Sequence, residues 1–334
     1  GMIPVVYDYG KEAFVKADTN SNWYNYNNKE WANIVLVSDT ERDKYNSALE
    51  GTQILENDVL AYYVWIPRYR YQIFYDGVNA TSKQLINIKF ESKETSKSTG
   101  NTVGSYLTHP AFTFGSDELD GIWVGKFELT GDTATPTIKP NLPSQGIQSI
   151  SSIFEVSKKL NYGTSRDTSI IKNSEWGAVA YLTTSIYGQG LTEIRINNSN
   201  GFITGAGIYN TPEGLLQSTT GNISGIYDMS GGTWEMVMGV MENSLGSNIP
   251  ISQIPGVDIK YYDIYPYGTT TGIIGDAIKE TKGWNSDSFL PIITQFPWFV
   301  RGGVYSDGAG AGIFSTSRSN GGNNRDQSSR VVLR

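Results

Sequence analysis

Six acidic residues are the first candidates for chemistry in this sequence of 334 residues. They are Asp117, Glu118, Asp120, Glu128, Glu175 and Glu235. Two carboxylates about 5 to 10 Å apart in a cleft can hydrolyse a glycosidic bond, with one acting as acid and the other as nucleophile or base. Their spacing along the chain does not indicate which of the six would pair, so a glycan hydrolase remains one candidate among several.

The only histidine, His109, is the candidate general base. It lies in "THPAF", ahead of a proline, and no serine or cysteine nucleophile signature surrounds it. We therefore expect a structural or surface role for this side chain. The sequence has no cysteine, which excludes a thiol nucleophile, a disulfide framework and a cysteine-based metal site.

Two further stretches have the composition of binding loops. "NNSNG", residues 197–201, and Asp228 are rich in the oxygen ligands that calcium prefers, but the chain has no EF-hand pattern. We expect no cofactor and keep a structural calcium ion as the alternative. "GAGAG", residues 308–312, is glycine-rich like a nucleotide-binding loop, yet no helix pattern follows it. It predicts a tight turn.

The composition favours a globular binding protein. The residues are 38% hydrophobic and 12% aromatic, which is enough for a sizeable core, and the net charge of −7 argues against nucleic acid as a partner. The 21 tyrosines and 8 tryptophans, with only 18% charged residues, are typical of extracellular recognition surfaces. The longest apolar run, residues 59–66, is too short to span a membrane. Gly1 ahead of Met2 resembles a cleavage scar, so we expect that a leader or anchor could have been removed.

The elements that must position any site begin with a β-rich segment. "MIPVVYD", "EAFVKADT" and "IVLVSD" read as strands, with the turn-rich "NSNWYNYNNKEWAN" between the last two. A short helix is expected in "ERDKYNSALEG", capped by Ser38 or Asp39. We interpret residues 1–60 as a small N-terminal module.

The rest of the chain alternates short strands, two helices and long loops. "RYRYQIFYD" and "KQLINIKFES" predict a hairpin, and "DGIWVGKFELTG" predicts a strand. Helices are expected over residues 146–160 and from Asn173 to Gly188. In the second helix Trp176, Val179, Ala180 and Ile186 should point inward. The predicted class is α+β.

Three of these stretches match one family pattern in order. "NSEWGAVAYL" is similar to an "EWEYAAR" helix, "GIYDMSGGTWEMVMG" to "GLYDMxGNVWEWV", and "RGGVYSDG…STSRSN…SSRVVLR" to "RGGSW…ARSAxR…GFRxV". The chain thus resembles the formylglycine-generating-enzyme (sulfatase-modifying factor) superfamily. The resemblance implies a C-type-lectin-like fold with two main helices, short antiparallel strands and long loops over residues 61–334, with core motifs in 105–334. It also places Glu175 and Glu235 inside fold motifs, where structural hydrogen bonding is expected.

Enzymes of this superfamily use a copper-binding cysteine pair or a histidine-rich iron site. The chain has no cysteine and one histidine, so both chemistries are excluded and the chain is expected not to be an enzyme. The resemblance instead favours the non-enzymatic branch, which includes the variable proteins of diversity-generating retroelements. In those proteins the last part of the fold carries a variable ligand-binding region.

The end of the sequence fits such a region. Residues 315–329 contain no apolar side chain, and they lie between Arg301-Gly302-Gly303 and Val331-Val332-Leu333. We expect a displayed loop that is held at both ends. The expected ligand-facing residues are Tyr305, Ser306, Asp307, Phe314, Ser315, Ser317, Ser319, Asn320, Asn323, Asn324 and Asp326. The expected scaffold residues are Trp176, Trp234, Trp298 and Arg301.

The resulting hypothesis is a binding protein of the receptor or adhesin type. Its partner would be a protein or glycan on another cell or surface, and its location would be extracellular, on a cell surface or on a phage particle. Two alternatives stay open: a structural surface or pilus-like subunit, and an enzyme of the same superfamily with a site that uses neither cysteine nor histidine.

Overall fold

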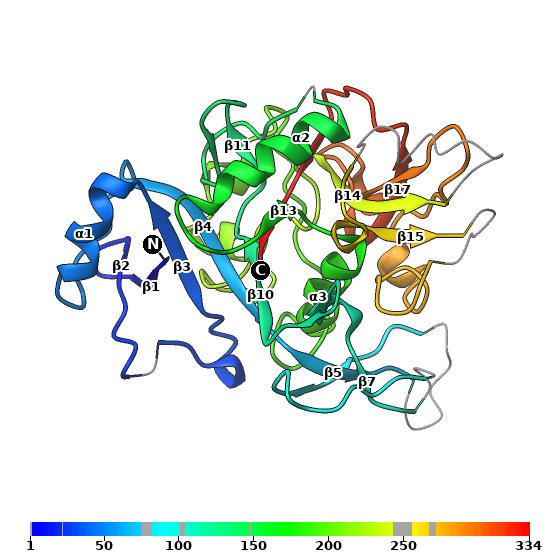
Figure 1. Cartoon of the computed structure of the whole chain (residues 1–334), viewed down its shortest axis with the longest axis horizontal. Helices are drawn as coiled ribbons and strands as arrows, with labels where there is room; N and C mark the ends of the chain where they lie inside the picture. Colours follow the sequence, from blue (N-terminus) through cyan, green and yellow to red (C-terminus); the bar gives the residue numbers. More distant parts are fainter. Residues whose placement is uncertain are drawn as a thin grey trace.

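The computed structural model describes residues 2–21, 23–74, 82–100, 104–146, 148–242, 256–266 and 272–334. The chain folds as a mixed α+β protein built mostly from open sheets with few helices. In Figure 1 the N-terminal elements lie at one end and strands β14, β15 and β17 at the other, with the C terminus near the middle. No helix within the described ranges is long and apolar enough to cross a membrane.

The largest sheet has seven strands, and every neighbouring pair in it is antiparallel. In spatial order they are β13 (Thr168–Ile170), β19 (Val331–Leu333), β10 (Gly121–Gly125), β4 (Val59–Pro67), β3 (Asn33–Val37), β1 (Met2–Asp8) and β2 (Ala13–Lys16). The three N-terminal strands confirm the sequence prediction. They extend the same sheet through the β3–β4 pairing, and the boundary predicted at residue 60 falls inside strand β4.

The second sheet carries the end of the chain. Its strands are β15 (Asp263–Tyr265), β14 (Trp234–Met241), β16 (Trp298–Gly302) and β17 (Gly312–Ser319), with β18 (Gln327–Ser329) also paired to β14. β14 runs parallel to β15 and β18, whereas β16 is antiparallel to both of its neighbours. After β18 the chain enters β19 in the large sheet, so its last residues connect the two sheets.

Smaller ladders and helices complete the fold. A three-stranded sheet contains β6 (Asn87–Phe90), β5 (Tyr69–Gln72) and β7 (Leu107–Thr108), which confirms the predicted hairpin. Two-stranded ladders join β8 (Thr113–Phe114) to β9 (Asp117–Glu118) and β11 (Thr130–Gly131) to β12 (Pro136–Thr137). The α-helices are α1 (Asp39–Ser47), α2 (Ile150–Ser157), α3 (Asn173–Thr183) and α4 (Pro212–Leu215).

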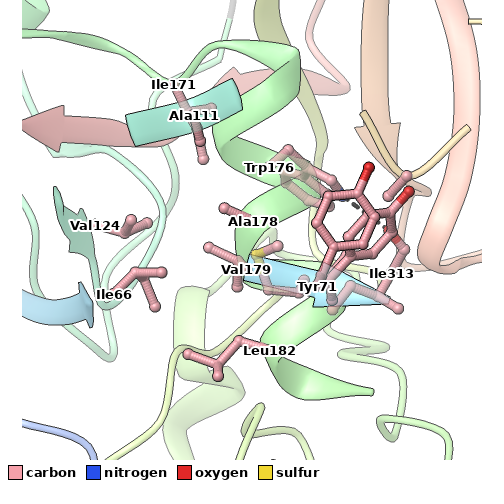
Figure 2. Close-up of a cluster of buried hydrophobic side chains, with 14 of the residues drawn as sticks. Ile66, Tyr71, Ala111, Val124, Ile171, Trp176, Ala178, Val179, Leu182 and Ile313 are labelled. Atoms are coloured by element: carbon pink, nitrogen blue, oxygen red, sulfur yellow. Dashed lines mark hydrogen bonds between the residues drawn. The ribbon is translucent and has the colours of Figure 1, made fainter. Parts of the chain in front are cut away.

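Helix α3 lies at the centre of the core. It contacts β4 of the large sheet and β14 of the second sheet, and all eleven of its residues are buried. Figure 2 shows Ala178, Val179 and Leu182 near Ile66 and Val124 of the large sheet. Trp176 points toward the C-terminal segment, where its indole donates a hydrogen bond to the Ile313 carbonyl at 2.8 Å. This helix therefore fixes the second sheet against the first.

Two predictions about the helices need correction. Helix α3 begins at Asn173 as expected but ends at Thr183, and Ile186 beyond it is 63% exposed. Since the backbone leaves the helix before this residue, the apolar periodicity no longer fixes its direction. Helix α2 begins at Ile150, later than the predicted start at residue 146, and is followed by a 3-10 turn, Lys158–Asn161.

Candidate functional site

Glu175 and Glu235 are both buried ion-pair partners of C-terminal arginines. Arg334 donates two hydrogen bonds to the Glu175 carboxylate, each at 2.6 Å. Arg330 donates to Glu235 at 2.6 and 3.1 Å. All four side chains are buried or nearly so. The expectation of structural hydrogen bonding is confirmed for both glutamates, and the pairs hold the chain end in the core.

Glu128 and Asp228 are buried in the same region of the fold. Glu128 accepts hydrogen bonds from the amide and hydroxyl of Thr233, and burial raises its pKa well above the usual range. Asp228 accepts from Asn197, Thr204 and Gly205. Donors of the chain therefore already surround the Asp228 carboxylate, and the calcium site considered from the sequence stays a prediction. No group of three or more histidine, aspartate or glutamate side chains that could hold a metal ion occurs in the described ranges.

The remaining three candidate acids lie on the surface near β9. Glu118 pairs with Arg68 at 2.6 Å and with Lys97 at 2.7 Å. Asp120 lies 3.5 Å from Lys93. Asp117 is exposed. The six acids are therefore divided between buried networks and surface ion pairs.

His109 is a core residue. Its ring is fully buried among Tyr69, Tyr71, Phe112 and Tyr181. Nδ1 accepts a hydrogen bond from the Ala111 amide at 3.2 Å, and burial lowers the pKa of the ring to about 3. The expected structural role is confirmed, since a neutral ring out of reach of solvent does not act as a general base.

The C-terminal segment starts with the connection between β16 and β17, residues 303–311. Gly302 and Gly303 at its beginning both have positive φ, at 86° and 83°, a backbone conformation that favours glycine. The Asp307 carboxylate then accepts a hydrogen bond from the Val304 amide at 2.9 Å. "GAGAG" begins with a single 3-10 turn, Gly308–Gly310, as the prediction of a tight turn requires. Ser306 is exposed at the outer side of this turn.

Strand β17 buries several of the residues that were expected to face a ligand. Phe314, Ser315 and Ser319 are 5%, 0% and 4% exposed, so these three side chains do not face a ligand as predicted. Phe314 packs on Trp284 with ring centroids 5.3 Å apart. The serines are covered because β17 carries neighbouring structure on both faces. Ser317 is half-buried.

The loop after β17, residues 320–326, is the exposed part of the segment. Asn320, Asn323, Asn324 and Asp326 are all exposed, as predicted. Two short turns stabilise the loop, in which Asn320 accepts from the Gly322 amide and Asn324 from the Asp326 amide. At its two ends the Gly321 carbonyl accepts from Ile150, and the Asp326 carbonyl accepts from the Trp234 amide. The loop is held at both ends, but it is shorter than the predicted 315–329, because residues 315–319 belong to β17 and residues 327–329 to β18.

Three side chains from distant parts of the sequence meet at this loop. The Tyr305 ring packs edge-on against Phe202 with centroids 5.3 Å apart, and the Arg325 guanidinium lies 5.8 Å from the centre of the same ring. Phe202 and Tyr305 are half-buried, whereas Arg325 is exposed. We call Phe202, Tyr305 and Arg325, together with Asn323, Asn324 and Asp326, the C-terminal patch.

Two solved structures are among those similar to this chain. One is the Treponema denticola variable protein 1, at 11% identity and a TM-score of 0.34, covering 84% of this chain and 98% of that one. The other is the Major Tropism Determinant U1 variant, at 12% identity and a TM-score of 0.31, covering 86% of this chain and 65% of that one. No protein-family model and no curated protein sequence matches. Both TM-scores lie below 0.5.

The predicted scaffold residues lie in the core or beside it. Trp176, Trp298 and Arg301 are buried, and Trp234 is half-buried beside the core. Arg301 donates to the Asn173 side chain and to the carbonyls of Asp276, Ala277 and Ser315. One guanidinium thus joins helix α3, a long loop and strand β17.

Sequence reasoning missed Phe202 and Arg325. Phe202 follows the oxygen-rich stretch 197–201, where an aromatic residue beside Gly201 was the available signal. Arg325 lies inside the apolar-free run, but its charge gave no reason to single it out. Together the patch offers an aromatic face, a guanidinium, two amides and a carboxylate, which are groups suited to recognition.

Proposed function

We propose that this chain is a binding protein that uses the C-terminal patch to recognise a protein or glycan on another cell or on a particle surface. It acts without catalysis. The proposal rests on one observation: Tyr305 and Arg325 both contact the ring of Phe202. This contact lies at the edge of the exposed loop 320–326, both ends of which are held by hydrogen bonds.

The rigidity of the support is what makes this surface suitable for recognition. A loop that is ordered before binding loses little conformational entropy when a ligand arrives. The loop of residues 320–326 is followed by β18 and by Arg330, which is completely buried against Glu235. Tyrosine and arginine are also the residue types that contribute most at interface centres.

We further propose that the exposed loop residues change identity between sister proteins while the buried ones do not. The composition of residues 304–329 is dominated by Ser, Asn, Gly and Asp, as in the variable proteins of diversity-generating retroelements. The same proposal includes a C-type-lectin-like fold and a place outside the cell, on a cell surface or on a phage particle. A neighbouring reverse transcriptase gene, with a near-copy of the codons for 301–334 that differs at adenines, is the genomic test.

A binding experiment tests the patch directly. The chain is applied to an array of defined glycans and purified bacterial surface proteins, and each hit is measured by surface plasmon resonance. The Phe202→Ala and Arg325→Ala variants should weaken binding by about tenfold or more. Ile186→Ala removes a side chain that is 63% exposed outside the patch and should leave affinity unchanged. Equal loss in all three variants, or in none, contradicts the proposal.

A further inference from the structure

A recess with a volume of about 350 Å³ opens among the N-terminal strands, away from the residues of the C-terminal patch. Its walls come from β1 and β2, from the segment between β2 and β3, and from residues 222–224. We call it the N-terminal recess, and the residues that matter are Tyr7, Tyr9, Trp23, Asn28, Glu30 and Asn222. Its volume lies at the lower end of the range for small-molecule sites, about 300 to 1,000 Å³.

Aromatic rings form one side of the recess, and neighbouring groups hold two of them in place. Tyr7 packs edge-on against Tyr9 and against Phe14, with centroids 5.1 and 5.2 Å apart. The Trp23 indole donates a hydrogen bond to the Val5 carbonyl at 3.3 Å and stacks on Trp123. Tyr9 is 64% exposed at the mouth. Such rings present flat apolar faces at low entropic cost.

Two polar groups of the recess have no protein partner. Within the described residues, neither the side-chain amide of Asn28 nor the carboxylate of Glu30 makes a hydrogen bond to another side chain or to the backbone. An amide offers donors and an acceptor, and a carboxylate offers two acceptor oxygens. The recess therefore combines an apolar face with unused hydrogen-bonding capacity.

The floor of the recess is built from segments about 190 residues apart in the sequence. Ser224 Oγ accepts a hydrogen bond from the Trp31 amide, and the Ser224 carbonyl accepts from Asn33. Below them the buried Lys126 ammonium donates to the Asn33 side chain and to the carbonyls of Ile223 and Gly225. Every donor of this ammonium has an acceptor, so the floor is rigid before any ligand binds.

The charges around the recess select among ligand classes. Among the described residues of the lining, Glu30 is the only charged side chain, so they offer no cation to hold a phosphate or carboxylate. Burial lowers the pKa of Lys126 beneath the floor well below its usual range, so this group sets no fixed charge against a cationic ligand, and choline is the direct comparison. A neutral ligand with one apolar face and many hydroxyl groups satisfies both the rings and the polar groups. We propose that the N-terminal recess binds a neutral saccharide of one or two rings.

Calorimetric titration with defined sugars tests this proposal. The probes are cellobiose, maltose, lactose and diacetylchitobiose, each to about 10 mM, with choline chloride as the cationic comparison. We expect saturable binding of at least one disaccharide and a change in tryptophan fluorescence from Trp23. Tyr9→Ala, at an exposed position that leaves folding intact, should weaken that binding by at least about fivefold.

Two further variants complete the design. Tyr305→Ala alters only the C-terminal patch and should leave sugar affinity unchanged. The sugar-binding result is therefore independent of whether the C-terminal patch binds a receptor. Glu30→Gln keeps an acceptor and should change sugar affinity by less than about threefold. No saturable binding of any disaccharide overturns the proposal, as does sugar binding that Tyr9→Ala leaves intact. Choline binding that Glu30→Gln abolishes, without sugar binding, overturns it in favour of a cation site.

Discussion

Glu235 and Arg330 face each other in a completely buried ion pair that attaches the end of the chain to strand β14. Arg330 lies 2.6 and 3.1 Å from the two carboxylate oxygens and also donates to the carbonyls of Gly125 and Tyr227. Burial raises the pKa of Glu235 to about 7, and the adjacent guanidinium opposes that rise. The pair lies just after the displayed loop, so the order of the loop depends on it.

The Glu235→Gln substitution should destabilise the protein strongly. It leaves the Arg330 guanidinium buried without its counter-charge, for which the expected cost is about 3 to 5 kcal/mol in the free energy of unfolding. Urea denaturation followed by tryptophan fluorescence measures this. Asp326→Asn removes a nearby but exposed carboxylate and should change stability by less than about 0.5 kcal/mol. Similar values for the two variants would show that the pair contributes little.

Exposed residues of the C-terminal segment should tolerate substitution, whereas buried residues of the same segment should not. Asn323→Tyr places a ring in solvent and should leave the melting temperature nearly unchanged. Ser315→Tyr forces a ring into a site with no exposed surface and should cost about 1 to 3 kcal/mol or more. Differential scanning fluorimetry of the two variants compares the positions directly. Equal tolerance would contradict the division between a variable surface and a fixed scaffold.

The turn after β16 should require glycine at residue 303 for two reasons. Gly303 has φ of 83°, and a Cβ there would lie 2.6 Å from Ala311. Gly308 has φ of 54° with nothing within 4 Å of a Cβ, so it serves as a control for the backbone strain alone. Gly308→Ala should cost about 1 kcal/mol, and Gly303→Ala should cost clearly more. Chemical denaturation measures both, and equal costs would refute the close approach.

Asp287 should make stability depend on pH. Burial raises the pKa of its carboxyl from an ordinary value of 3.8 to about 7, while one oxygen accepts from the Phe314 amide and the other has no protein partner in the described ranges. The folded state keeps the proton up to about pH 7, whereas the unfolded chain releases it near pH 3.8. The contribution of this carboxyl to the free energy of unfolding is therefore fully present below pH 3.8. It is lost as the pH rises to about 7.

The Asp287→Asn variant tests that assignment. Asn keeps the acceptor for Phe314 and carries no charge, so it should gain on the order of 1 to 4 kcal/mol over the wild type at pH 8. The gain should shrink as the pH is lowered toward 4. Unfolding free energies of both proteins across this range measure the difference. A difference that stays constant with pH would show that Asp287 is not the titrating group.

Much of the local structure was predictable from the sequence. The apolar runs in "MIPVVYD" and "IVLVSD" predicted β1 and β3, and the start of the helix at Asn173 was placed correctly. The segments around Arg301 and Val331 predicted a loop held at both ends, although the loop itself is limited to residues 320–326. These features depend on the periodicity of apolar residues and on the residue types that form turns. Both signals come from residues that are close together in the sequence.

The sequence by itself determined a globular chain with short strands, a buried central helix and a polar segment near its end. Only the tertiary structure decided which polar residues of that segment are buried. Ser315 and Ser319 resemble Asn323 in a sequence, but β17 is covered by β16 and neighbouring loops while residues 320–326 face solvent. Tertiary structure also brought Phe202 to Arg325, and Ser224 to Trp31. Contacts between residues so far apart in the sequence arise from strand pairing and side-chain packing. A local sequence pattern therefore does not predict them.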